Sequence, residues 1–104
     1  MTRISKRKLA SMIEEATVDA YDESAQAAGW HAMFEDHLAL PFETTVLGVG
    51  VKVIQLDLRS DNSIVAVCQR DGERLAIPIL DLPLPKPQPE GAEWIEAYRH
   101  WLGG

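Results

Sequence analysis

The hydrophobic pattern of this chain changes at Leu40-Pro41, and this change limits the folds open to it. Before it, apolar side chains recur every three or four positions, as on one face of a helix. From Phe42 onward they alternate and β-branched residues dominate, as in strands. Proline forces the preceding residue into an extended conformation, so the helical part ends there. With 104 residues, the chain is predicted to be a single α+β domain, with helices first and strands after them.

Two helices are expected before this change. The first covers about residues 5–21 with Ser5 as its N-cap, and the second runs from Asp22 or Glu23 to His37 with Asp22 as its N-cap. Gly29 either weakens the second helix or admits a closely packed neighbour. The side chains expected on the buried face of the second helix are Ala25, Ala28, Met33 and Phe34.

The alternating pattern predicts four short strands. They are residues 44–47, 51–58, 64–70 and 73–80. The apolar face of the second strand switches midway, which often marks a β-bulge, and Asp71-Gly72 is typical of a type I′ hairpin turn. Pro78 indicates that the last strand has a free edge or ends early. We expect the sheet over residues 42–82 to curl into a small SH3-like barrel.

The end of the chain is predicted to be a connector and a helix. Alternating prolines over residues 83–89 predict an extended polyproline tether, with a ligand for a proline-binding domain as the alternative. Residues 90–102 predict a helix with Trp94, Tyr98 and Trp101 at helical spacing. These aromatic side chains are expected to anchor the helix on the core; stacking on a cofactor is the alternative.

Charge is unevenly distributed along the chain. Sixteen acidic and ten basic residues give a net charge of −6, which disfavours nucleic acid and anionic membranes as partners. Four basic residues lie in a leader, residues 1–8, whereas no Lys or Arg occurs from Leu9 to Val51. The acidic helical segment, residues 9–38, is either a solvated face that keeps the protein soluble or a cation site. The leader's basic residues are Arg3, Lys6, Arg7 and Lys8.

Cysteine and histidine usage limits both the compartment and the chemistry. Cys68 is the only cysteine, so no intramolecular disulfide can form and a reducing cytoplasm fits best. No apolar stretch approaches the roughly 18 residues of a membrane span. Catalysis by a nucleophile and base would have to use Cys68 with one of three histidines, and no recognisable spacing connects them. We therefore expect no enzymatic activity.

The acidic segment suits a hard cation such as calcium, which takes six to eight oxygen ligands. No EF-hand spacing is present, so a site would have to be assembled from separate segments. The first predicted helix also opposes the helix dipole, with Lys6, Arg7 and Lys8 in its first turn and Asp19 in its last. This indicates that the carboxylates are placed for another purpose. The candidate calcium ligands are Asp19, Asp22 and Glu23 at the junction of the two helices, and Glu35 and Asp36 at the end of the second.

Four short motifs follow one another along the chain: Val18-Asp19-Ala20-Tyr21, Gly29-Trp30, Glu35-Asp36 and Pro41-Phe42. In this order they resemble the opening of the CcbP-type calcium-binding protein family. The last strand and the Trp-rich tail are also similar to the family's ending, so the resemblance spans most of the chain after about residue 10. It implies a small cytosolic protein with a barrel-like β core, non-EF-hand calcium sites built from carboxylates, and no enzymatic activity. The residues that match acidic positions of the family are Asp19, Glu23, Glu35 and Asp36, with Asp22 in its acidic stretch.

The sequence departs from the family at two places where the family carries further carboxylates. They read Val49-Gly50-Val51-Lys52 and the short loop Arg59-Ser60-Asp61-Asn62-Ser63. The leading hypothesis is therefore a calcium-binding protein, acting in calcium buffering or signalling, whose ligands come mainly from the N-terminal half. The alternative is a metal-free protein-interaction module that uses the barrel surface or the edge near Pro78. A third hypothesis is that the basic leader contacts an anionic partner.

Overall fold

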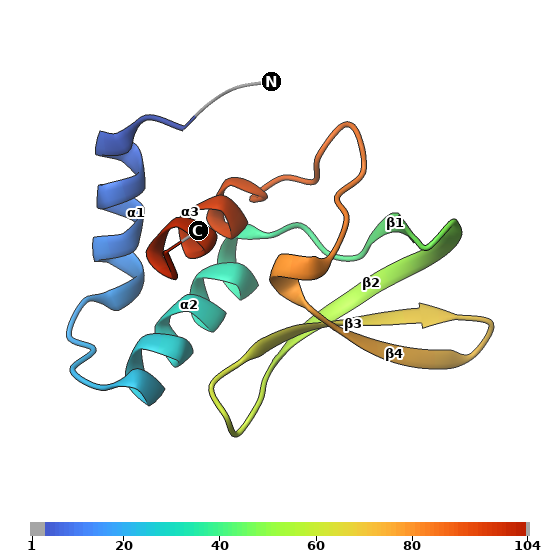
Figure 1. The fold of residues 1–104 in the computed structure, drawn as a ribbon, viewed down its shortest axis with the longest axis horizontal. Coiled ribbons are helices and arrows are strands. Elements are labelled where there is room, and N and C mark those ends of the chain that lie inside the picture. Colours follow the sequence, from blue (N-terminus) through green and yellow to red (C-terminus); the bar gives the residue numbers. More distant parts are fainter. Residues whose placement is uncertain (1–3, 104) are drawn as a thin grey trace.

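The structure, a computed structural model, describes residues 4–103 (Figure 1). It confirms the predicted α+β class: two N-terminal helices, a four-stranded antiparallel sheet and one C-terminal helix. Met1 to Arg3, part of the basic leader, lie outside the described residues. The elements are α1 (Lys6–Thr17), α2 (Glu23–His37), β1 (Phe42–Val46), β2 (Val49–Leu58), β3 (Ile64–Arg70), β4 (Glu73–Pro78), the short 3-10 helix η1 (Ile79–Asp81) and α3 (Glu93–Trp101).

Both predicted helix caps are confirmed. The Ser5 hydroxyl accepts a hydrogen bond from the Lys8 backbone N–H at 3.1 Å, and the Asp22 carboxylate accepts one from the Ala25 N–H at 2.7 Å. Helix α1 nevertheless ends at Thr17, earlier than predicted. Asp19 has a φ of 57°, a left-handed conformation that cannot continue a helix. The expectation that Asp19 lies in the last turn of α1 is therefore wrong.

The sheet is an open antiparallel meander in the order β1-β2-β3-β4. Leu47-Gly48 and Asp71-Gly72 form its two-residue turns, and all four residues have positive φ, as a type I′ turn requires. The predicted bulge lies in β2, where Ile54 is the extra residue between two paired positions. Within residues 4–103, β1 and β4 form the two edges and do not pair with each other, so backbone pairing does not close a barrel.

The helices gather at one end of the sheet (Figure 1) and pack on each other, and α2 also packs against β2. Trp30 of α2 is fully buried, and its ring centroid lies 6.4, 5.3 and 5.6 Å from those of Trp94, Tyr98 and Trp101. This confirms that the aromatic side chains of α3 anchor it on the core. The buried face of α2 differs from the predicted one. It consists of Ala27, Trp30 and Phe34, while Met33 is half-buried and Ala28 is exposed.

The proline-rich connector joins η1 to α3 without forming a helix or strand, and it bends at residues 86–87 instead of running fully extended. It is held at both ends: the Pro83 carbonyl accepts a hydrogen bond from the Thr44 hydroxyl at 2.6 Å, and the Glu90 carbonyl accepts one from the Ala39 N–H at 2.8 Å. The Glu90 end lies beside the C-terminus of α2. Helix α3 begins at Glu93, after a turn at residues 90–92.

Gly29 marks the closest approach of α1 and α2. A Cβ at this position would collide with the backbone carbonyl oxygen of Ala16, which belongs to α1 and cannot turn away as a side chain could. Of the two roles predicted for Gly29, the structure therefore supports close packing. This contact fixes the angle at which α1 meets α2.

Replacing Gly29 by alanine should destabilise the fold. Alanine is the better helix former by about 1 kcal/mol, but the collision forces α1 away from α2, and we expect a net loss of about 1–3 kcal/mol in the free energy of unfolding. Chemical denaturation measures this. The matched control is Ala28→Gly at the neighbouring exposed position, which should lose only about 1 kcal/mol. A Gly29→Ala protein more stable than the wild type would contradict the close contact.

Candidate metal centre

The first group of candidate ligands lies in the connection between α1 and α2. Asp19 is part of a tight turn in which the Ala20 N–H donates to the Thr17 carbonyl at 3.1 Å. Asp22 follows as the cap of α2, and Glu23 is the first residue of that helix. All three carboxylates are exposed. One oxygen of Asp22 is used by the cap, so the group offers its remaining oxygens to solvent.

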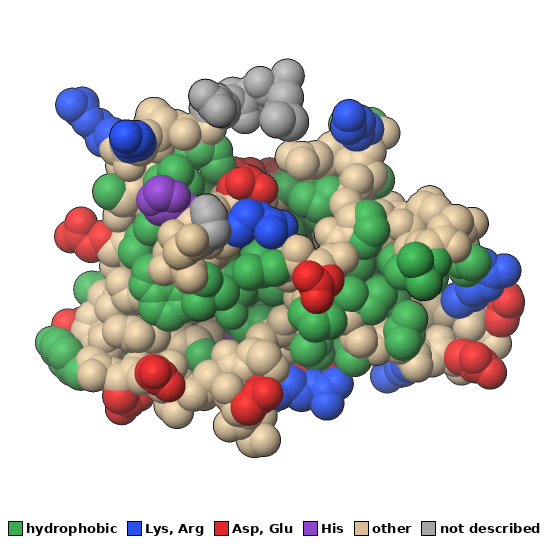
Figure 2. Space-filling view, in the orientation of Figure 1, with side chains coloured by type: hydrophobic (Ala, Val, Ile, Leu, Met, Phe, Trp, Pro, Cys, Tyr) green, Lys and Arg blue, Asp and Glu red, His purple; other side chains and the backbone are tan. Residues whose placement is uncertain are grey.

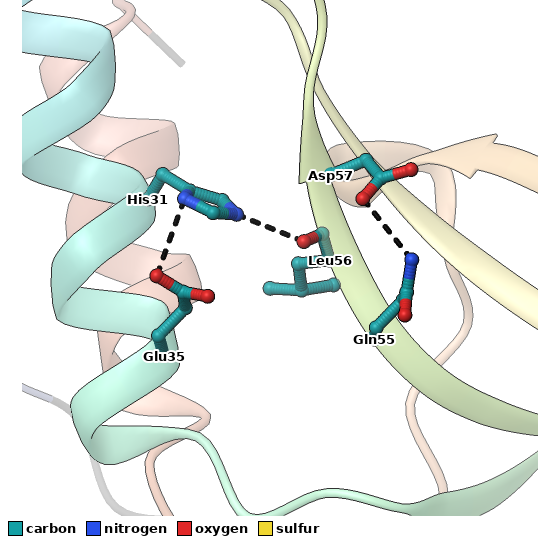
Figure 3. Close-up of polar contacts among 5 residues, drawn as sticks. All are labelled: His31, Glu35, Gln55, Leu56 and Asp57. Atoms are coloured by element: carbon teal, nitrogen blue, oxygen red, sulfur yellow. Dashed lines mark hydrogen bonds and ion pairs between the residues drawn. The ribbon is translucent and has the colours of Figure 1, made fainter.

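The second group lies in the last turn of α2 (Figure 3). Glu35 and Asp36 are both exposed, and Glu35 lies one turn after His31. A Glu35 carboxylate oxygen is 3.5 Å from Nδ1 of His31, and Nε2 of the same ring donates to the Leu56 carbonyl of β2 at 2.8 Å. Because Nε2 carries this hydrogen, neutral His31 presents an unprotonated Nδ1 to Glu35. His31 thus connects the second group to the sheet beside the bulge.

The two groups cannot share an ion. Glu23 and Glu35 stand at opposite ends of a helix, about 18 Å apart along its axis at 1.5 Å per residue. Calcium ligands lie about 2.3–2.6 Å from the ion. Helix α2 therefore separates the two groups, and the members of each group are neighbours in sequence only. In the part of the chain that the structure describes, no three His, Cys, Asp or Glu side chains converge as a preformed metal cluster.

Gln55 and Asp57 are polar residues of β2 that flank Leu56, and neither is among the candidate ligands predicted from the sequence. The Gln55 side-chain amide donates to the Asp57 carboxylate at 3.2 Å. Both flank Leu56, but they project from the opposite side of β2 to that facing His31 (Figure 3). Successive side chains of a strand point to opposite faces of the sheet, so Gln55 and Asp57 lie on one face and Leu56 on the other. The period-two pattern of the sequence is enough to predict this difference. Asp57 is therefore not a partner for Glu35.

The loop between β2 and β3 uses its carboxylate for the turn. Asp61 accepts hydrogen bonds from the Ser63 hydroxyl at 2.6 Å and from the Ser63 N–H at 3.0 Å. These bonds hold the pKa of Asp61 below its usual value. Both hydrogen bonds use Oδ1, so the turn occupies one oxygen of this exposed carboxylate, as the cap does for Asp22.

A groove of about 710 Å³ lies between β1, β2 and the connector. Its charged lining residues are Glu43 and Lys52, which pair across β1 and β2. A single carboxylate facing a lysine does not favour a divalent cation. The groove is therefore not a candidate metal centre.

Comparison with known proteins bears on this arrangement. A family model described as calcium binding, that of CcbP, matches residues 11–102 and so includes both groups of carboxylates. The chain belongs to the CcbP calcium-binding family. No curated protein sequence matches it.

Two solved structures show that the CcbP fold is shared. The crystal structure of Anabaena CcbP aligns with a TM-score of 0.73 at 20% sequence identity, covering 98% of this chain and 95% of that one. A calcium-binding protein in its calcium-binding form aligns with a TM-score of 0.74 at 19% identity, with the same coverage. In the present member of the family, none of the helices in residues 4–103 is long and apolar enough to cross a membrane.

The contacts of His31 and Glu35 predict unequal effects on stability. His31→Ala leaves the Leu56 carbonyl without its donor and should cost about 1–2 kcal/mol in the free energy of unfolding. Glu35→Gln removes only an exposed pair and should cost less than about 0.5 kcal/mol. Urea denaturation of both variants checks this. An equal, large loss in Glu35→Gln would mean that this carboxylate is needed for the fold and is not free for a cation.

Proposed function

We propose that this protein binds calcium in two separate places, one at each end of α2. The site at the N-terminal end uses Asp19, Asp22 and Glu23, and that at the C-terminal end uses Glu35 and Asp36. The observation that carries the proposal is the family match across residues 11–102, which contains these five carboxylates. The Anabaena relative is named as CcbP and the second as a calcium-binding protein, and both share this fold.

The chemistry of the donors fits calcium. All five side chains supply hard carboxylate oxygens, and all are exposed, so a hydrated ion can reach them. No lysine or arginine lies between Leu9 and Val51 to compete for them. Bound calcium would supply the charge that neutralises neighbouring carboxylates. Within the described residues, the imidazole of His31 beside Glu35 is the only basic side chain within ion-pair distance of these five carboxylates.

Two or three carboxylates at each end leave much of the coordination to water and backbone carbonyls. Affinity for calcium falls as the number of charged ligands falls, so we expect dissociation constants of about 10⁻⁴–10⁻³ M at each site. Sites this weak fill only where the local calcium concentration is high, because cytosolic buffers and sensors bind calcium orders of magnitude more tightly. Binding at one end should leave the other largely unaffected because the two ends are about 18 Å apart.

The remaining features support a non-enzymatic, cytoplasmic role. Cys68 has only 1% of its surface exposed, and burial raises the pKa of its thiol, so it is a poor nucleophile. As the only cysteine in the sequence, it has no partner for a disulfide, which fits a reducing compartment. The proposal therefore assigns neither a catalytic step nor a structural disulfide to this chain.

Calorimetric titration of the metal-free protein with calcium tests the proposal. We expect heat at millimolar calcium, and an increase in the free energy of unfolding of about 1.4 kcal/mol for each site when free calcium is ten times its dissociation constant. The double variant Asp22→Asn/Glu23→Gln should lose one of the two binding events. Asparagine caps a helix as well as aspartate does, so α2 remains intact. Glu35→Gln/Asp36→Asn should lose the other event.

Glu73→Gln is the matched control, since it removes an exposed carboxylate of β4 and should leave both events unchanged. Absence of heat and of thermal stabilisation at millimolar calcium would overturn the proposal. Loss of all binding in either double variant would instead show one shared site and contradict the separation along α2.

A further inference from the structure

The outer edge of the sheet at β4 is open. Among the helices and strands, β4 packs chiefly against β3, and five of its six residues are exposed. The other edge, at β1, lies against the connector, whose Pro83 carbonyl accepts the Thr44 hydroxyl. Figure 2 shows hydrophobic side chains at the surface over the end of the sheet that lies away from the helices. An open, partly apolar edge is a template for another strand.

The register of the β3–β4 hairpin shows which backbone groups of β4 are available. The two-residue turn makes Arg70 and Glu73 its closing hydrogen-bonded pair, and such pairs alternate along an antiparallel ladder. The backbone N–H and C=O groups of Leu75 and Ile77 therefore form hydrogen bonds with β3. Arg74 and Ala76 direct their N–H and C=O groups outward, and Pro78, the next outward residue, has no N–H.

The side chains of this edge allow a second copy of β4 to pair with it. Leu75 is 54% exposed and lies on the same face of the sheet as the half-buried Ile77. If two β4 strands run antiparallel with Leu75 opposite Leu75, each Arg74 lies opposite an Ala76 and each Glu73 opposite an Ile77. No two like charges face each other directly, and both outward N–H groups of each strand find carbonyl acceptors. Pro78 then falls beyond the hydrogen-bonded stretch and ends it.

We propose that β4 is a homodimerisation edge, at which a second copy of this chain pairs antiparallel about Leu75 and joins the two open sheets into one. The occupant is another copy because the pattern of outward groups is complementary to itself. The six-residue strand buries less surface than the roughly 1,200 Å² of a stable complex, so the dimer is weak and forms at high protein concentration. The net charge of −6 on each copy opposes it.

Sedimentation velocity of the wild-type protein from tens of micromolar to about 1 mM tests this. We expect a monomer–dimer equilibrium that strengthens with added salt, because salt screens the repulsion between two acidic copies. Amide hydrogen exchange should slow with concentration at Arg74 and Ala76 and should stay constant at Thr45 on the β1 edge. The experiment needs no calcium, so it is independent of the proposed function.

Two variants distinguish what the backbone hydrogen bonds of β4 contribute to dimer formation from what its side chains contribute. Ala76→Pro removes an outward donor but no hydrogen bond to β3, and should weaken association about tenfold or more. Leu75→Lys places two ammonium groups opposite each other and should weaken it similarly. Pro78→Ala, outside the paired stretch, is the matched control and should dimerise at least as well as the wild type. Thermal melting verifies that each variant is folded.

A wild-type protein that stays monomeric throughout this range would overturn the proposal. So would a dimer that persists unchanged in folded Ala76→Pro and Leu75→Lys, or slowed exchange at Thr45 in place of Arg74 and Ala76. The latter result would assign the interface to the opposite edge.

Discussion

The burial of Trp30 is the interaction on which the arrangement of this domain depends. Its side chain is fully enclosed and contacts aromatic rings of α3, so it fixes α2 against the C-terminal helix. Its Nε1 is buried with no acceptor among the described residues, a cost that the aromatic packing outweighs. One residue earlier, Gly29 brings the backbone of α1 into contact. The core face of α2 therefore holds the helical layer together while both ends of the helix remain at the surface.

This makes α2 a rigid spacer between two groups of carboxylates. Its dipole affects them differently: the partial negative charge at the C-terminus favours a cation near Glu35 and Asp36, whereas the partial positive charge at the N-terminus favours the carboxylates of Asp22 and Glu23 themselves. His31 holds the C-terminal part against β2 at a carbonyl next to the bulge. A cation at that end would thus be attached to a segment fixed by both the sheet and the core. The electrostatics of the helix make it the better of the two proposed sites.

Local chemistry in the sequence predicted the features that depend on a few neighbouring residues. The caps Ser5 and Asp22, the Asp71-Gly72 turn and the bulge in β2 all follow from side-chain type or alternation, and the structure confirms them. The buried face of α2 could not be predicted in the same way, because Ala27 and Ala28 are chemically identical and only their packing in the folded protein distinguishes them. The open sheet and the His31–Leu56 bond depend on contacts between distant segments. The sequence already placed the candidate ligands at the two ends of the second predicted helix, and the bounds of α2 agree with that placement.

A crystal structure of the protein with calcium is the most direct test of the account. We predict two ions, one beside Asp19, Asp22 and Glu23 and one beside Glu35 and Asp36, each with carboxylate oxygens at about 2.3–2.6 Å and water completing the shell. A single ion bound elsewhere, for example at the β2–β3 loop with Asp61, would contradict the assignment of calcium binding to the two ends of α2.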